Sequence, residues 1–213
     1  MEKRNWKRSV TLKQRMVLCL AAFFAAFALQ LALNGYQARA VQQVQDDQMS
    51  NFNAISRFQG GVESSISILE AYRWENGETE EMLEKLQAAC STSNAWLWRI
   101  RSNMDGLQNV SDEQWVLYGA VETTYGSYNT LLEELEGYLT RGQDAKASQL
   151  YYNKVSVCGG YLSQYTMQLL KASILDAQTT YTEISELGER IALMQIVVVA
   201  LCVALGCASG LMV

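Results

Sequence analysis

Residues 118–139 read YGAVETTYGSYNTLLEELEGYL, and their apolar and aromatic side chains recur at alternating steps of three and four residues. This spacing places the recurring side chains on one face of an α-helix, where they can pack against partner helices. The alternation of apolar and polar residues that is typical of strands is absent over any comparable length. The predicted core positions of this segment are Tyr118, Val121, Tyr125, Tyr128, Leu132, Leu135 and Leu139.

Three further segments repeat the pattern, so the sequence predicts an all-α fold. One lies before and one after the short turn signal Asn76-Gly77, and the last follows Arg141-Gly142. Their predicted core positions are Phe52, Ile55, Gln59, Val62, Ile66, Leu69 and Arg73, then Leu83, Leu86, Cys90, Ser93, Leu97, Ile100, Met104 and Leu107, and finally Val155, Cys158, Leu162, Tyr165 and Leu169.

The connections between these segments are short and carry residues that cap helices. Ser111 followed by Gln114 is typical of a capping box, and Asp144 is expected to cap the last helix. Short connections make sequential helices antiparallel neighbours, so we expect an up-down-up-down four-helix bundle. The predicted helices cover about residues 37–74, 79–106, 111–141 and 145–190.

The composition of the 213 residues excludes several classes of function. Hydrophobic residues make up 49% and charged residues 18%, which is unlike a disordered chain. The chain has no histidine, so it contains neither a Ser-His or Cys-His pair nor a phosphoacceptor histidine. It has no Cys-x-x-Cys pair, and its acidic runs at 78–84 and 133–136 argue against nucleic-acid binding. We expect no catalytic activity, no metal and no cofactor.

The charges are unevenly distributed along the chain. Residues 1–15 contain six basic residues against Glu2 alone, a net charge of +5, whereas 16–38 and 191–213 contain no charge. Each uncharged run would span roughly 35 Å as a helix, enough to cross a bilayer. Cleavage of a signal peptide at Ala38-Arg39-Ala40 is the alternative for the first run.

We therefore expect a two-pass membrane protein whose orientation follows the excess of positive charge on the cytoplasmic side. The predicted parts are a basic cytoplasmic tail at 1–15, transmembrane helix 1 at 16–36, an extracytoplasmic bundle at 37–190 and transmembrane helix 2 at 191–213, with a cytoplasmic part missing after it.

This organisation resembles the sensory front end of bacterial transmembrane receptors. It is most similar to the input module of two-component sensor histidine kinases, and next to that of methyl-accepting chemotaxis receptors. The resemblance covers the entire chain but rests on architecture and on no diagnostic motif. It implies a bacterial inner-membrane location, a homodimer, an unknown extracellular ligand or protein as partner, and signalling by displacement of helix 4. A membrane-anchored structural or adaptor bundle is the alternative.

Small residues are predicted to meet at one level of the bundle. They lie about 13–16 residues from the distal turns, which places them in one cross-section. We favour the interpretation that they make room for large side chains or for close helix approach; a flexible section in helix 4 and a small-molecule cavity are the alternatives. These residues are Gly60, Gly61, Cys90, Ser93, Gly126, Cys158, Gly159 and Gly160.

The cavity interpretation supplies a set of candidate ligand-binding residues. Gln59, Ser93, Tyr125 and Tyr161 would be its polar groups, and Arg57 would pair with a carboxylate ligand, although an ordinary solvated arginine is favoured there.

Two pairs of side chains have structural alternatives that the sequence leaves open. Cys90 and Cys158 are a candidate disulfide, but helices two and four are diagonal in a square bundle, so two free thiols are favoured. Trp96 and Trp98 flank the inward-facing Leu97 and are predicted either to cover the bundle edge or to face a partner.

Overall fold

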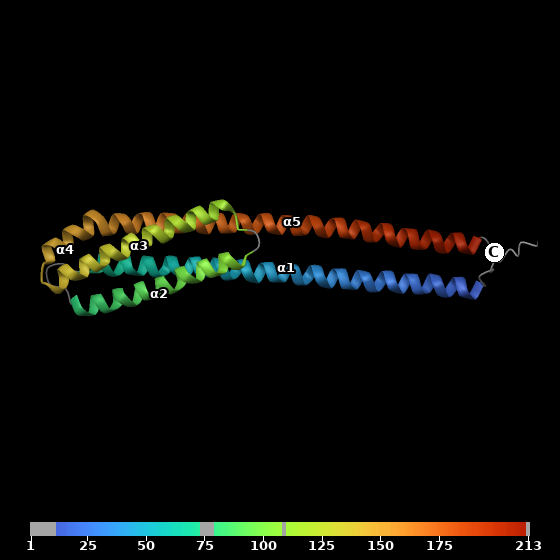
Figure 1. The fold of residues 1–213 in the computed structure, drawn as a ribbon, viewed down its shortest axis with the longest axis horizontal. Coiled ribbons are helices and arrows are strands. Elements are labelled where there is room, and N and C mark those ends of the chain that lie inside the picture. The colour runs from blue at the N-terminus through green and yellow to red at the C-terminus, as the bar shows by residue number, and fades with distance from the viewer. Residues whose placement is uncertain (1–11, 73–78, 108–109, 212–213) are drawn as a thin grey trace, which may run out of the picture. The chain divides into compact units, whose positions relative to one another are not determined.

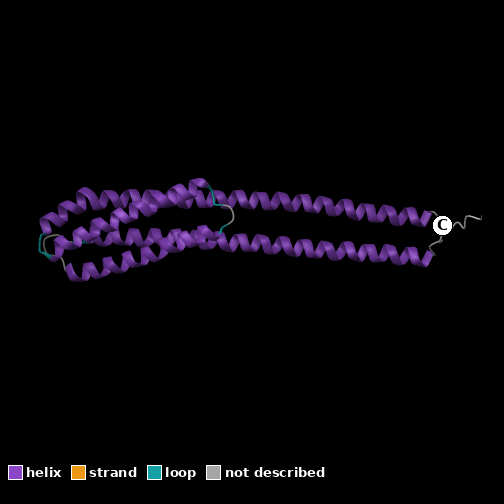
Figure 2. Ribbon diagram, viewed as in Figure 1, coloured by secondary structure: helices purple, strands orange, loops and turns teal. Residues whose placement is uncertain are grey.

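The computed structural model describes residues 12–72, 79–107 and 110–211, and every regular element in these ranges is helical (Figures 1 and 2). The prediction of an all-α fold is therefore confirmed. In chain order the elements are α1 (Leu12–Ala71), α2 (Thr79–Gly106), α3 (Asp112–Thr140), α4 (Asp144–Leu150), the π-helix η1 (Tyr151–Val155) and α5 (Ser156–Leu211).

The chain divides into two compact units. One consists of Val44–Thr180, and the other combines Met1–Gln43 with Tyr181–Val213, so α1 and α5 each supply residues to both. In the second unit the two helices approach closely at Gly188, where an added methyl group would collide with the side-chain amide of Gln37. The absence of a side chain at Gly188 therefore makes room for Gln37.

The unit Val44–Thr180 contains a single hydrophobic core to which every element contributes. All seven predicted core positions of α3, from Tyr118 to Leu139, are buried. The periodicity of this segment was therefore sufficient to identify its buried face. Figure 1 shows α2, α3 and α4 alongside the residues of α1 and α5 that belong to this unit.

The buried face of α1 differs in part from the predicted one, since Ile55, Val62 and Leu69 are buried as predicted. Phe52 is 36% exposed and Gln59 donates a hydrogen bond to Glu63 at the surface, whereas Asn51 and Phe58 are fully buried. The buried residues Asn51, Phe58 and Ser65 each lie one position before the predicted Phe52, Gln59 and Ile66, so the buried face is rotated toward that side of the helix.

The last helix of the unit is interrupted, which the sequence analysis did not predict. Instead of one helix from residue 145, α4 leads into the π-helix η1, in which the Ser156 backbone N–H bonds to the carbonyl of Tyr151, five residues earlier. Ala147, Tyr151 and Val155 are all buried at steps of four. An α-helix would rotate such positions away from the core, and the wider π turn keeps them facing it.

The turns bear out part of the predicted capping. The Ser111 hydroxyl accepts a hydrogen bond from the Gln114 N–H at 3.3 Å, as expected of an N-cap. Gly142 has a φ of 65°, the left-handed conformation that favours glycine after a helix. Asp144 was expected to cap the next helix but is its first residue, after Gln143.

Some predicted residues lie outside the described part of the chain. These are the predicted core position Arg73 and the turn residues Asn76 and Gly77.

The predicted two-pass membrane localisation is contradicted by the structure. Among the residues that the structure describes, no helix combines the length and the hydropathy needed to cross a bilayer.

Candidate ligand cavity between α2 and α3

A cavity of about 350 Å³ lies between α2 and α3. Its apolar wall includes the buried side chains of Leu86, Tyr125 and Leu132, and polar groups surround this wall. An apolar wall with a few polar groups is the usual composition of a small-molecule site. The lining residues are Leu83, Leu86, Gln87, Cys90, Ser91 and Asn94 from α2, and Tyr125, Asn129, Leu132, Glu133 and Glu136 from α3.

Tyr125 connects this cavity to α1. Its hydroxyl donates a hydrogen bond of 2.8 Å to the Cys90 carbonyl, which fixes α3 against α2. Its ring packs edge to face on Phe58, with ring centroids 5.3 Å apart. Since Phe58 is fully buried on α1, a change at the cavity wall contacts the core of the unit directly.

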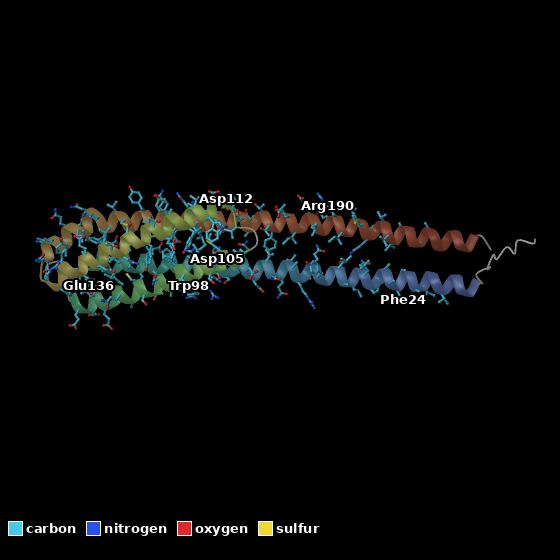
Figure 3. All side chains as sticks on the ribbon, viewed as in Figure 1. Phe24, Trp98, Asp105, Asp112, Glu136 and Arg190 are labelled. Atoms are coloured by element: carbon cyan, nitrogen blue, oxygen red, sulfur yellow. The ribbon has the colours of Figure 1, made fainter. Side chains whose placement is uncertain are left out.

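The ionisable groups of the wall are of two kinds. Burial raises the pKa of Tyr125 to about 12 and that of the Cys90 thiol to about 11, so both are uncharged near neutral pH. The other two are the carboxylates of Glu133 and Glu136, and Glu136 accepts a hydrogen bond from the Gln87 amide at 3.1 Å (Figure 3 labels Glu136). The charge of the lining is therefore entirely negative.

The predicted level of small residues includes two close approaches. A methyl group on Gly61 would collide with the Ser93 hydroxyl, so α1 and α2 meet there. A methyl group on Gly159 would lie 3.0 Å from Ile66 Cδ1 and 3.3 Å from Tyr128 Cε2. These two glycines fit the interpretation of close helix packing.

The other three glycines of this level, Gly60, Gly126 and Gly160, have no atom within 4 Å of an added methyl group. Close packing does not account for them.

The predicted ligand-binding residues do not gather at one site. Tyr125 lines the cavity, whereas Ser93 is buried beside Gly61 and donates to the Ala89 carbonyl. Tyr161 is 54% exposed on α5.

Arg57 and Gln59 lie elsewhere on α1. Arg57 lies over the Trp96 ring, with its guanidinium carbon 5.4 Å from the ring centroid, and Gln59 bonds to Glu63. The half-buried Trp96 thus covers the bundle edge, while Trp98 is 70% exposed (Figure 3).

Among the polar side chains of the cavity, Tyr125 is the one that the sequence analysis named as a candidate ligand-binding residue. Gln87, Asn129, Glu133 and Glu136 flank the core stripes of α2 and α3, where polar residues are expected on any solvated helix face. Their spacing of three or four residues along each helix is the one signal that they share a face.

Cys90 and Cys158 are both free thiols. The Cys158 thiol donates to the Thr124 carbonyl at 3.7 Å, and burial raises its pKa. The favoured alternative of two thiols therefore describes this structure.

Polar side chains form a second feature that the apolar pattern missed. Asn51, Gln114 and Ser173 are at least 97% buried, and each has a side-chain oxygen or nitrogen without a hydrogen-bond partner among the described residues. Asn103, half-buried on α2, has an unpartnered amide nitrogen.

These polar side chains lie at matching heights in pairs. Asn51 and Asn103 are each ten residues from the Gly61–Ser93 contact, along helices that run in opposite directions. Gln114 and Ser173 are each three residues from the bond between the Ser111 N–H and Asp176, which measures 3.1 Å. The four residues therefore occupy neighbouring levels near the α2–α3 turn.

Known proteins give no further guide to the site. The chain matches no known family, no curated protein and no solved structure. Among the described residues no group of three or more cysteine, aspartate or glutamate side chains could hold a metal ion. Function is therefore inferred from the cavity and its connections.

Proposed function

We propose that the chain is a ligand-sensing input module of a signalling protein, of the kind that controls a sensor histidine kinase. The observation that carries this proposal is the cavity between α2 and α3, whose wall residue Tyr125 also packs on Phe58 of α1. A ligand that binds there contacts two helices directly and a third through one side chain.

We infer that the helices of Val44–Thr180 form an up-down-up-down four-helix bundle. Contacts between successive helices support it: Gly61 with Ser93 for α1 and α2, and the Gln87–Glu136 hydrogen bond for α2 and α3. The short connection around Gly142 supports an antiparallel α3 and α4.

In this proposal, signalling requires two arrangements of the bundle for which the ligand has different affinities. Helix α5 would carry the difference, because it belongs to both units. The unpaired polar groups at Asn51, Gln114 and Ser173 support a second arrangement. An unpaired buried polar group costs roughly 1–3 kcal/mol, so an arrangement that pairs these groups would gain free energy.

We propose that the module acts as a homodimer through α5. Val157, Tyr161, Ile174 and Leu175 are between 41% and 59% exposed on this helix within the unit Val44–Thr180. Exposed apolar side chains at helical spacing are typical of a surface that faces a partner.

A protein-binding adaptor is the second candidate function. The exposed Trp98 on α2 favours it, because an exposed tryptophan is often an anchor in protein interfaces. An adaptor needs no coupling between the cavity and α5, which is where the two candidates differ.

The proposal is tested by filling the cavity. Ser91 lines it and is exposed, so Ser91→Phe should occupy the space without disturbing the core. We expect this substitution to change the rate of amide hydrogen exchange in α5 between Gly160 and Thr180, because the filled cavity favours one arrangement. The matched control is Thr92→Phe, at an exposed neighbour that does not line the cavity.

If wild type, Ser91→Phe and Thr92→Phe all have the same exchange rates in α5, the cavity is not coupled to α5. That result would contradict the sensing function and leave the adaptor function. Equal changes in both variants would show only a general effect of an added phenyl ring.

A further inference from the structure

The geometry of the α2–α3 cavity points to the chemical class of its ligand. We infer that it binds an organic monocation, such as an alkylammonium ion, that carries a short apolar group; this rests on the proposed function, since it assigns a ligand to the same cavity.

The charge of the lining determines this choice. Glu133 and Glu136 are the charged side chains among the lining residues, and no lysine or arginine is among them. The nearest basic residue along α2, Lys85, is paired with Glu81 at 2.5 Å. An anion would approach two carboxylates with no basic side chain in the lining, so the site discriminates against it.

The hydrogen-bonding groups of the lining are also suited to a donor. An ammonium group has only donors, and the carboxylate oxygens together with the amide oxygens of Asn94 and Asn129 are acceptors. The Tyr125 hydroxyl is already used on the Cys90 carbonyl. The Gln87 amide uses one of its two N–H groups on Glu136.

The apolar wall accommodates the rest of the ligand. Leu83, Leu86 and Leu132 form it, and the latter two are at least 94% buried. A volume of about 350 Å³ is at the lower end of the range for small-molecule sites, roughly 300–1,000 Å³. A chain of several methylene groups fits this space better than a large ring system.

The test is titration calorimetry of the full chain with three probes of equal length: hexylammonium, hexanol and hexanoate. We expect hexylammonium to bind about tenfold more tightly than hexanol, and hexanoate to bind most weakly. Each exposed charge interaction contributes a factor of about 1.4 to 5 in affinity, so two carboxylates account for a difference of that order.

Charge-neutralising variants of the two carboxylates locate the interaction. Glu133→Gln and Glu136→Gln should each weaken hexylammonium binding about two- to fivefold and leave hexanol binding unchanged. Glu134→Gln is the matched control, because Glu134 is exposed on the same helix and does not line the cavity. Circular dichroism checks that each variant is folded.

The outcomes separate this inference from the proposed function. If hexanol binds as tightly as hexylammonium and Ser91→Phe abolishes both, the cavity is a ligand site but not one for cations. If hexylammonium fails to bind wild type, or binds Ser91→Phe and both glutamine variants as tightly as wild type, the inference is overturned. The exchange experiment on α5 uses no ligand, so its result stands independently.

Discussion

Gly159 and Gly160 are adjacent in α5 but have different surroundings. An added methyl group would press on Ile66 and Tyr128 at the first position and would meet nothing within 4 Å at the second. Glycine in a helix costs roughly 0.5–1 kcal/mol relative to alanine unless its lack of a side chain is needed.

We therefore predict opposite effects of alanine at these two positions. Gly160→Ala should raise the free energy of unfolding by about 0.5–1 kcal/mol, the difference in helix propensity. Gly159→Ala should lower it, because Tyr128 in the core and Ile66, which packs against the core, must both move. Urea unfolding measures both free energies. If the two variants change the free energy of unfolding in the same direction, the two glycines do not differ in the way described here.

At the residue scale the sequence predicted that small residues share a level but not what each one faces. Which of two adjacent glycines touches a neighbour depends on a rotation of about 100° around the helix. The count from the turns fixes height and leaves that rotation undetermined. For the same reason Tyr161, two residues from Gly159, was assigned to the interior but is exposed.

At the scale of elements, α3 was predictable and α1 was less so. Every predicted core position of α3 is apolar or aromatic, so its stripe has one placement. On α1 the predicted stripe contained Gln59, and the true core contains Asn51, so polar residues obscured the buried face. The π turn at Tyr151–Val155 is indicated by buried residues spaced four apart, at 147, 151 and 155. A search for alternating steps of three and four does not detect this spacing.

The buried tyrosines of α3 predict alkaline sensitivity. Burial raises the pKa of Tyr118 and of Tyr125 from 10.0 to about 12, and that of Cys90 from 9.0 to about 11. Above pH 9 the unfolded chain loses these protons first, so the free energy of unfolding should fall as the pH rises from about 9 to about 12. Below pH 9 these groups contribute no pH dependence.

Urea unfolding across this pH range measures the effect. Tyr125→Phe should reduce the slope, because one group no longer ionises, although loss of its hydrogen bond lowers the stability at neutral pH by about 1 kcal/mol. Tyr161→Phe, at an exposed site, is the control for the loss of a tyrosine hydroxyl. A slope that is the same in all three proteins would show that Tyr125 ionises freely in the folded state.

At the scale of the whole molecule, the sequence predicted the helices but not the cavity. The cavity lies between two helices and is lined by residues beside their core stripes, so no single segment contains its signal. The localisation that was predicted from the charge distribution is also wrong, because no helix among the described residues combines the length and the hydropathy needed to cross a bilayer.

The central claim is that the α2–α3 cavity controls the position of α5 relative to α1 within Val44–Thr180. The most direct measurement is the distance distribution between two spin labels at the exposed positions Asp47 and Thr179, attached by a chemistry that spares cysteine. We predict that the distribution shifts in Ser91→Phe and matches wild type in Thr92→Phe. Coincident distributions in all three proteins would contradict the claim.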